Sequence, residues 1–207
     1  MEFRRVLFRS NGASQVIPVA SLEEARLWGD KGALMAGERN GFRVEGFDFG
    51  NSPQEFTIEK VNGKSVVMTT TNGTHALNLC KSAGVVYVAA FLNCSITCRS
   101  LMGERGDIYL FCSGWKGLFN LEDTLLAGAM ASQLIGMGAI VADDATRAAI
   151  HLWKQAQTNL SEFLSDANHV QRFQSMHAES DLDVCLKIDS SEKTVYYVGG
   201  ELVTERR

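Results

Sequence analysis

Residues 65–75 of the 207-residue chain read SVVMTTTNGTH, and they decide the expected fold. The β-branched start of this segment is typical of a short buried strand, and its hydroxyl-rich remainder is typical of a polar turn. A helix over residues 75–82 is expected next. A strand that ends in hydroxyl residues just before a helix gathers backbone N–H groups, a glycine and O–H donors at the positive end of the helix dipole. Phosphate binds at such places. An ordinary helix cap explains the same residues, and the motif alone does not separate the two readings.

Short apolar segments alternate with helical patterns up to residue 157, which predicts an α/β fold. Strands are expected over residues 14–20, 33–36, 65–68, 84–91, 108–112, 183–188 and 194–198. Helices are expected over residues 21–30, 93–102, 121–137 and 143–157. Ser21, with Glu24 three residues on, is expected to cap the first of them. Because no linker, repeat or low-complexity tract interrupts the chain, we predict one domain over residues 1–207. Its expected architecture is a three-layer α/β/α sandwich with a mostly parallel or mixed sheet.

The composition excludes several classes of protein. A net charge of −4 and a pI of about 5.6 argue against a general nucleic-acid or membrane-surface binder. No apolar run approaches the ~18–20 residues of a membrane span. Five cysteines scattered through apolar segments suit a reducing cytosol better than a disulfide framework, so a cytoplasmic location is expected.

Polar residues follow four of the five clearest strands, at residues 37–39, 69–74, 91–93 and 112–114. If the sheet is parallel there, these loops converge on one edge, where α/β proteins bind ligands. Arg39 suits an anion clamp. Carboxylates in or near these loops suit Mg²⁺, which takes one or two carboxylates together with waters and substrate phosphate oxygens.

Each of these residues also has a structural explanation. Arg39 could instead form an ion pair with Asp48 or a nearby glutamate. Glu122 and Asp123 could simply stabilise the first turn of a helix. Cys112 could be a nucleophile activated by a nearby lysine and a helix N-terminus, but a small buried cysteine is the commoner case. The Ala/Gly/Met face of residues 126–137 suits packing inside the protein or against a second copy, so a homodimer stays open.

Five motifs in chain order extend this picture. They are AGER at 36–39, GFD and GNSP with Glu55 in 46–55, TTTNGT with Ala76-Leu77, FLN at 91–93, and CSG with Gly117 and LED in 112–123. Together they resemble the 2-phosphosulfolactate phosphatases (ComB-like proteins), over about residues 11–177. The resemblance implies an α/β fold, Mg²⁺ as cofactor, and hydrolysis of a phosphate ester on a small sulfonated hydroxy acid. In that reaction 2-phosphosulfolactate gives sulfolactate and phosphate, a step towards coenzyme M.

With the resemblance, roles are assigned to particular residues, and the expected partner is a small anionic phosphate or sulfonate. Substrate binding is expected of Arg39, Asn51, Ser52, Thr70, Thr71, Asn72, Gly73, Thr74, Ser113 and Gly114. Catalytic roles are expected of Glu38, Asp48 and Cys112. Metal binding is expected of Glu122 and Asp123.

The start of the chain departs from the family pattern. Family members usually begin with a strand that bears an Asp and an Arg followed by threonines, and then a helix that leads to an Asn-Gly-Ala-like turn. Here MEFRRVLFRS stands directly before Asn11-Gly12-Ala13, without that Asp and without room for the helix. Residues 1–10 are therefore expected to be a non-native replacement of the first strand–helix unit, with no helix of their own. The alternative function is a catalytically impaired anion-binding or assembly subunit with the same fold.

Overall fold

The computed structural model describes residues 3–39, 42–50, 52–115, 117–168, 170–171 and 179–205. The chain divides into two compact units, each described by itself below. The sheet unit comprises Glu2–Ala89 and Ser191–Arg207, and the helical unit comprises Ala90–Ser190. The single domain expected over residues 1–207 stays a prediction. No helix in the described part of the chain combines the length and apolar character needed to cross a bilayer.

The sheet unit contains a seven-stranded mixed sheet in the order β3-β2-β4-β1-β7-β6-β5, which confirms the predicted α/β class. The strands are β1 (Gln15–Pro18), β2 (Leu34–Arg39), β3 (Phe42–Arg43), β4 (Ser65–Thr69), β5 (Tyr87–Val88), β6 (Val195–Val198) and β7 (Glu201–Val203). β4 pairs in parallel with β1 on one side and with β2 on the other. The remaining pairings are antiparallel.

Both faces of the central strands are buried, as expected for strands in a layered α/β fold. Ile17 of β1 and Val67 of β4 share one hydrophobic cluster with Ala25 of helix α2 (Leu22–Gly29). Side chains alternate between the faces of a strand, so Val16 and Val66 point to the opposite face, and both are 0% exposed. Helices therefore have apolar surface to cover on either side of this sheet.

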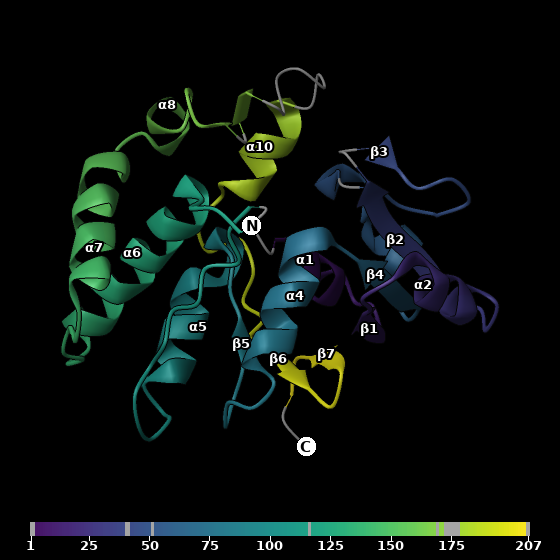
Figure 1. The fold of residues 1–207 in the computed structure, drawn as a ribbon, viewed down its shortest axis with the longest axis horizontal. Coiled ribbons are helices and arrows are strands. Elements are labelled where there is room, and N and C mark those ends of the chain that lie inside the picture. Colours follow the sequence, from purple (N-terminus) through teal and green to yellow (C-terminus); the bar gives the residue numbers. More distant parts are fainter. Residues whose placement is uncertain are drawn as a thin grey trace. The chain divides into compact units, whose positions relative to one another are not determined.

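Sequence signals for helix ends are confirmed in this unit, with one shift. Ser21 caps α2 by accepting from the N–H of Glu24 at 3.1 Å, as the spacing predicts. Helix α4 (Thr71–Cys80) begins four residues before the expected start, so the polar residues after β4 form its first turn rather than a separate turn (Figure 1). The unit also contains the short helices η1 (Pro53–Glu55) and α3 (Ile58–Val61).

The expectation that residues 1–10 contain no helix is wrong. Residues Phe3–Ser10 form helix α1, which packs on β1 and β7. Val6 and Phe8 are 0% exposed, and the Phe8 ring lies 4.3 Å from the ring of Phe56 between centroids. Burial of these apolar side chains stabilises a helix that is too short to persist alone in water.

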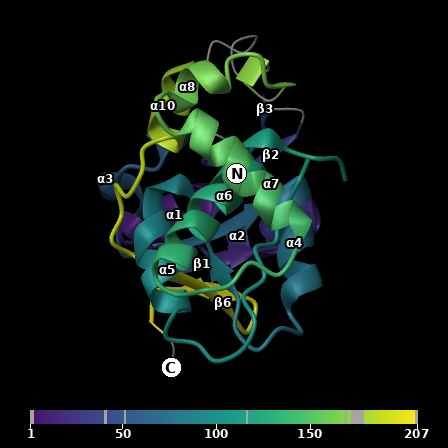
Figure 2. The ribbon, with the colours of Figure 1, turned by 90° about the vertical axis from the view of Figure 1, so that its left-hand side faces the viewer.

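Among the described residues, the helical unit contains η2 (Phe91–Asn93), α5 (Cys94–Leu101), α6 (Leu121–Gly136), α7 (Asp144–Ala156), α8 (Leu160–Phe163) and α10 (Glu179–Cys185). α5, α6 and α7 lie where the sequence predicts helices. α6 and α7 run side by side in both views (Figures 1 and 2).

Three predicted strands need correction. Only Tyr87–Val88 of residues 84–91 is a strand, and it lies at the edge of the sheet rather than at its centre. Residues 108–112 form no strand, and Tyr109 is 85% exposed, so this apolar run is not covered on both faces. Residues 183–188 begin inside α10, where Leu182 and Cys185 are buried at the i, i+3 spacing of a helix. A short apolar run has no periodicity that separates these cases.

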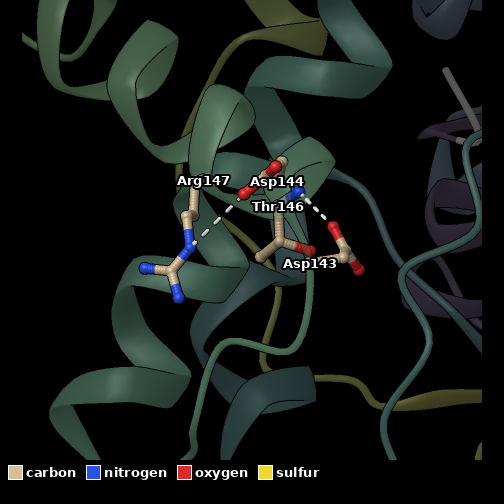
Figure 3. A network of polar contacts seen from close by, with 4 residues as sticks. All are labelled: Asp143, Asp144, Thr146 and Arg147. Carbon is tan, nitrogen blue, oxygen red and sulfur yellow. Dashed lines mark hydrogen bonds and ion pairs between the residues drawn. The ribbon is translucent and has the colours of Figure 1, made fainter.

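α7 begins with a polar network drawn in Figure 3. Asp143 occupies the N-cap position and accepts from the N–H of Thr146 at 2.7 Å. This hydrogen bond is the main reason that the pKa of Asp143 lies below its usual value. The neighbouring Arg147–Asp144 ion pair, at 3.8 Å, is exposed to solvent and contributes little.

A glycine allows α6 and α7 to approach closely. A Cβ atom on Gly128 of α6 would lie 2.1 Å from the carbonyl oxygen of Ala149 and 2.9 Å from Cβ of Trp153, both on α7. The small-residue face of α6 therefore contacts a neighbour within the same unit. The homodimer stays a prediction.

Replacing Gly128 with Ala is expected to destabilise the protein by about 1–3 kcal/mol or more, because the new methyl group overlaps the α7 backbone. The matched control is Gly136→Ala in the same helix, where a Cβ meets nothing within 4 Å. The control should be neutral or stabilising by up to about 1 kcal/mol, because alanine is the better helix former. Urea denaturation of the two variants measures the difference, and equal unfolding free energies would contradict the close approach.

Candidate functional site

The carboxyl ends of β2 and β4 meet at one edge of the sheet, as predicted. The two strands are parallel neighbours, and Gly37 of β2 pairs with Thr69 of β4. Arg39 lies two residues beyond Gly37, and α4 starts two residues beyond Thr69. The predicted Arg39 clamp and the first turn of α4 therefore belong to the same edge of the sheet. The loops at 91–93 and 112–114 belong to the helical unit, and their convergence on this edge stays a prediction.

Close packing brings the two strand ends together. A Cβ atom on Gly37 would lie 3.0 Å from the ring of Phe47 and 3.1 Å from the methyl group of Thr69. Thr69 is 0% exposed, and its hydroxyl oxygen has no hydrogen-bond partner among the described residues. A buried hydroxyl normally has a partner. The end of β4 therefore holds polar capacity that the described residues do not use.

Thr70 occupies the N-cap position of α4 but does not act as a cap. Its side chain makes no capping hydrogen bond to the helix. Instead its hydroxyl oxygen, and that of Thr74 one turn on, accept from Nη2 of Arg5 at 3.4 and 3.2 Å. Arg5 comes from α1 and is 1% exposed, and burial lowers the pKa of its guanidinium to about 9. Two hydroxyl groups assigned to substrate binding thus share a buried cation.

Sequence reasoning missed Arg5 as a member of this site. It lies 65 positions before Thr70, inside the basic segment that was expected to be a replaced first unit. No local pattern joins the two residues. The only signal for Arg5 was its position beside the buried apolar residues of α1, and that signal is visible only once α1 is known to be a helix.

The predicted residues around β2 and the following segment have local partners. Glu38 and Arg39 are half-buried, and Nη1 of Arg39 donates to the backbone oxygen of Glu38 at 2.8 Å. Asp48 accepts from the N–H of Met35 at 2.8 Å, so its carboxylate supports β2 at a point three residues before Glu38. The alternative ion pair between Arg39 and Asp48 is absent among the described contacts. Ser52 caps η1, and Asn51 lies outside the described residues.

In the helical unit, the carboxylate of Asp123 accepts hydrogen bonds from two other predicted site residues. Asp123 accepts from the hydroxyl group of Ser113 at 3.1 Å and from the N–H of Gly114 at 2.9 Å. Asn120 caps α6 through the N–H of Asp123. Glu122 and Asp123 are both buried in the first turn of α6. Ser113 and Gly114 thus serve an internal anion in this structure.

Asp189 contacts both the loop at 91–93 and the helix that follows it, and its backbone N–H donates to the carbonyl oxygen of Phe91 at 3.0 Å. Asp189 accepts from the N–H of Ser95 at 2.7 Å and from the hydroxyl group of the same residue, at the start of α5. Asp189 has φ of 53°, a left-handed conformation that costs energy in a residue other than glycine. A carboxylate therefore occupies the N-terminal end of α5, as expected for a favourable helix-dipole position.

The fit to Mg²⁺ depends on how many protein ligands are required. No group of three or more His, Cys, Asp or Glu side chains suited to a metal is found among the described residues. The candidate carboxylates Asp48 and Asp123 already accept hydrogen bonds through one oxygen each. Glu38, at the same sheet edge as Arg39, is chemically suited to a cation that keeps several waters and substrate oxygens as ligands.

The surroundings of Cys112 disfavour its thiolate. The residue is exposed, yet nearby protein atoms raise its pKa to about 11, mainly by displacing water and then through the negative charge of Asp123. A nucleophilic cysteine has a lowered pKa in an electropositive environment. The nucleophile role stays a prediction without support from this environment.

Alkylation of Cys112 by iodoacetamide is expected to be slow at pH 7 because its pKa is raised to about 11. The rate should increase about tenfold for each pH unit towards that value, because only the thiolate reacts. Peptide mass spectrometry measures the rate, with Cys112→Ser as the control that identifies the modified peptide. Rapid modification at pH 7 that does not change between pH 7 and 9 would contradict the raised pKa.

Known proteins resemble this chain over most of its length. The sequence profile of the 2-phosphosulpholactate phosphatase family matches residues 6–200. A protein of Thermotoga petrophila named "Probable 2-phosphosulfolactate phosphatase" is 38% identical over 198 residues, which cover 94% of this chain and 83% of that protein. Proteins with the same name from Caldanaerobacter subterraneus and a Synechococcus species are 37% and 40% identical, covering 86% and 87% of this chain and 76% and 78% of their own lengths. The chain belongs to the 2-phosphosulpholactate phosphatase family.

Proposed function

We propose that the chain is a phosphatase that hydrolyses 2-phosphosulfolactate to sulfolactate and phosphate. Family membership over residues 6–200 supports the reaction class, and the names of the relatives support the substrate. The single observation that carries the site is the parallel pairing of β2 with β4, which brings Arg39 and the first turn of α4 to one sheet edge. A doubly charged phosphate ester with a sulfonate suits an edge built from a guanidinium and helix amides.

The proposed roles follow from what each group can donate. Backbone N–H groups of residues 71–74, at the positive end of α4, hold the phosphoryl oxygens. Arg39 neutralises the negative charge of these oxygens, and this stabilisation matters most in the transition state, as the leaving group departs. Glu38, next to Arg39, positions the attacking water and takes its proton as the new P–O bond forms. The bond from phosphorus to the ester oxygen breaks, the proton passes from Glu38 to that oxygen, and the products are the alcohol and inorganic phosphate.

We also propose dependence on Mg²⁺, bound by Glu38 together with waters and substrate oxygens. When bound, the cation would neutralise charge on the phosphoryl group. The absence of a three-ligand cluster among the described residues is compatible with a cation that arrives with the substrate. The five free cysteines support the proposed cytosolic location. Participation in coenzyme M biosynthesis and a homodimer are further proposals, from the resemblance and from the small-residue face of α6.

A second candidate function is anion binding without hydrolysis. The observation that favours it is that Arg5 of α1 places a buried cation on Thr70 and Thr74 of the proposed site. Such a subunit would be stabilised thermally by phosphate or sulfonates but would release no product. The same protein preparation distinguishes the two functions.

The purified chain is expected to release inorganic phosphate from 2-phosphosulfolactate in the presence of Mg²⁺ and much less after EDTA treatment. A colorimetric phosphate assay measures both, and a phosphate ester without the sulfonate is the substrate control. Thermal stabilisation by phosphate without any turnover would favour the non-catalytic function. Absence of turnover in a version that carries a family-type first strand and helix would refute the phosphatase proposal.

Replacing Arg39 with Ala is expected to lower kcat/KM by about 10- to 100-fold, because a charge-assisted contact to phosphate is lost. Arg26→Ala is the matched control, since Arg26 lies on α2 with its guanidinium 5.7 Å from the centre of the Phe47 ring. Steady-state kinetics of the two variants test the assignment. Equal losses in both variants, or no loss in Arg39→Ala, would show that Arg39 does not contact the substrate.

A further inference from the structure

Arg5 donates hydrogen bonds to the hydroxyl groups of two threonines at the start of α4, Thr70 and Thr74. A threonine in the N-cap position normally accepts from the backbone N–H of the second or third helical residue, which is Gly73 in the third position here. Thr70 makes no such bond, and its oxygen accepts from Arg5 instead. Thr74 accepts from the same guanidinium nitrogen. Both contacts are buried and lie within the sheet unit.

The contacts with Arg5 leave the hydroxyl protons of Thr70 and Thr74 available to donate. A guanidinium only donates, so the threonine oxygens are acceptors in both contacts and each keeps its own proton for another partner. The helix amide that Thr70 would have capped also keeps its proton. The result is a set of O–H and N–H donors at the positive end of α4, next to a buried positive charge, and such a set favours an anion.

We propose that Arg5 is a positioning residue of the anion site: it holds Thr70 and Thr74 so that their hydroxyl protons and the first-turn amides of α4 are available to a phosphate group. The inference rests on the proposed function for its ligand, but not for the arrangement of Arg5, Thr70 and Thr74. Arg5 precedes residues 6–200 that match the family, so the match assigns it no role.

Amide hydrogen exchange tests the arrangement without any ligand. In Arg5→Met the Thr70 hydroxyl is released and can cap the helix, so the Gly73 N–H should exchange several-fold more slowly than in the unchanged chain. Arg9→Met is the matched control: Arg9 lies on the same helix, is half-buried, and donates to Ala13 and Thr204 rather than to α4. Arg9→Met should leave the exchange of Gly73 unchanged. Equal exchange in Arg5→Met and the unchanged chain would overturn the proposal.

Titration with inorganic phosphate, followed by calorimetry, tests the consequence for binding. Arg5→Met is expected to weaken phosphate binding about tenfold or more, with Arg5→Lys intermediate and Arg9→Met unaffected. In a Thr70→Val, Thr74→Val background the further change Arg5→Met should have little effect, because Arg5 acts through those two residues. Additive losses would contradict a positioning role.

Two further readouts separate the possible failures. If Arg5→Met does not fold, as judged by circular dichroism, Arg5→Lys provides the test: its loss of phosphate affinity should disappear in the Thr70→Val, Thr74→Val background. A loss of the same size in both backgrounds overturns the proposal. If the exchange of Gly73 changes as expected but the unchanged chain releases no phosphate from 2-phosphosulfolactate, the proposed function fails while the role of Arg5 stands.

Discussion

The parallel pairing of β4 with β1 and β2 is the constraint on which the sheet unit and its site depend. Val66 and Val67 are fully buried on opposite faces of β4, so a shift of one residue would exchange the two faces. β4 is paired with both neighbours at once, so that Val67 lies opposite Ile17 of β1 and Met35 of β2, and in this register Gly37 pairs with Thr69. Arg39 lies two residues beyond Gly37 and α4 starts two residues beyond Thr69, so their position at one sheet edge is a consequence of this pairing.

In both units a charged side chain lies at the start of a helix, but the charge is negative in the helical unit and positive in the sheet unit. In the helical unit, Asp189 accepts from Ser95 at the start of α5, and Asp123 accepts from Gly114 before α6. At the start of α4 the charged group is instead the cation Arg5, and burial lowers the pKa of this group. Burying a guanidinium costs energy, and its hydrogen bonds to Thr70 and Thr74 offset part of that cost. An anion bound near the start of α4 would add a favourable interaction with this charge.

Sequence patterns predicted the elements whose signals are local. The Ser21 cap, the valines of β4 and the long apolar faces of α6 and α7 each lie within one helix turn or strand of the residues that explain them. The expected strand at 108–112 failed because apolar character does not reveal whether a partner strand exists. Arg5 was missed because its contact with Thr70 spans 65 positions. The edge formed by β2 and β4 was predictable from the general rule for parallel sheets. The loops at 91–93 and 112–114 were assigned to the same edge by that rule, but no strand precedes the loop at 112–114 in the structure.

The most direct measurement is a backbone amide NMR titration of the ¹⁵N-labelled chain with inorganic phosphate. If β2 and β4 form one anion-binding edge, the largest shift changes fall on the amides of residues 71–74 and 37–39, and they saturate with a single dissociation constant. Changes confined to residues 91–95 or 112–117, with those of α4 unaltered, would contradict the account.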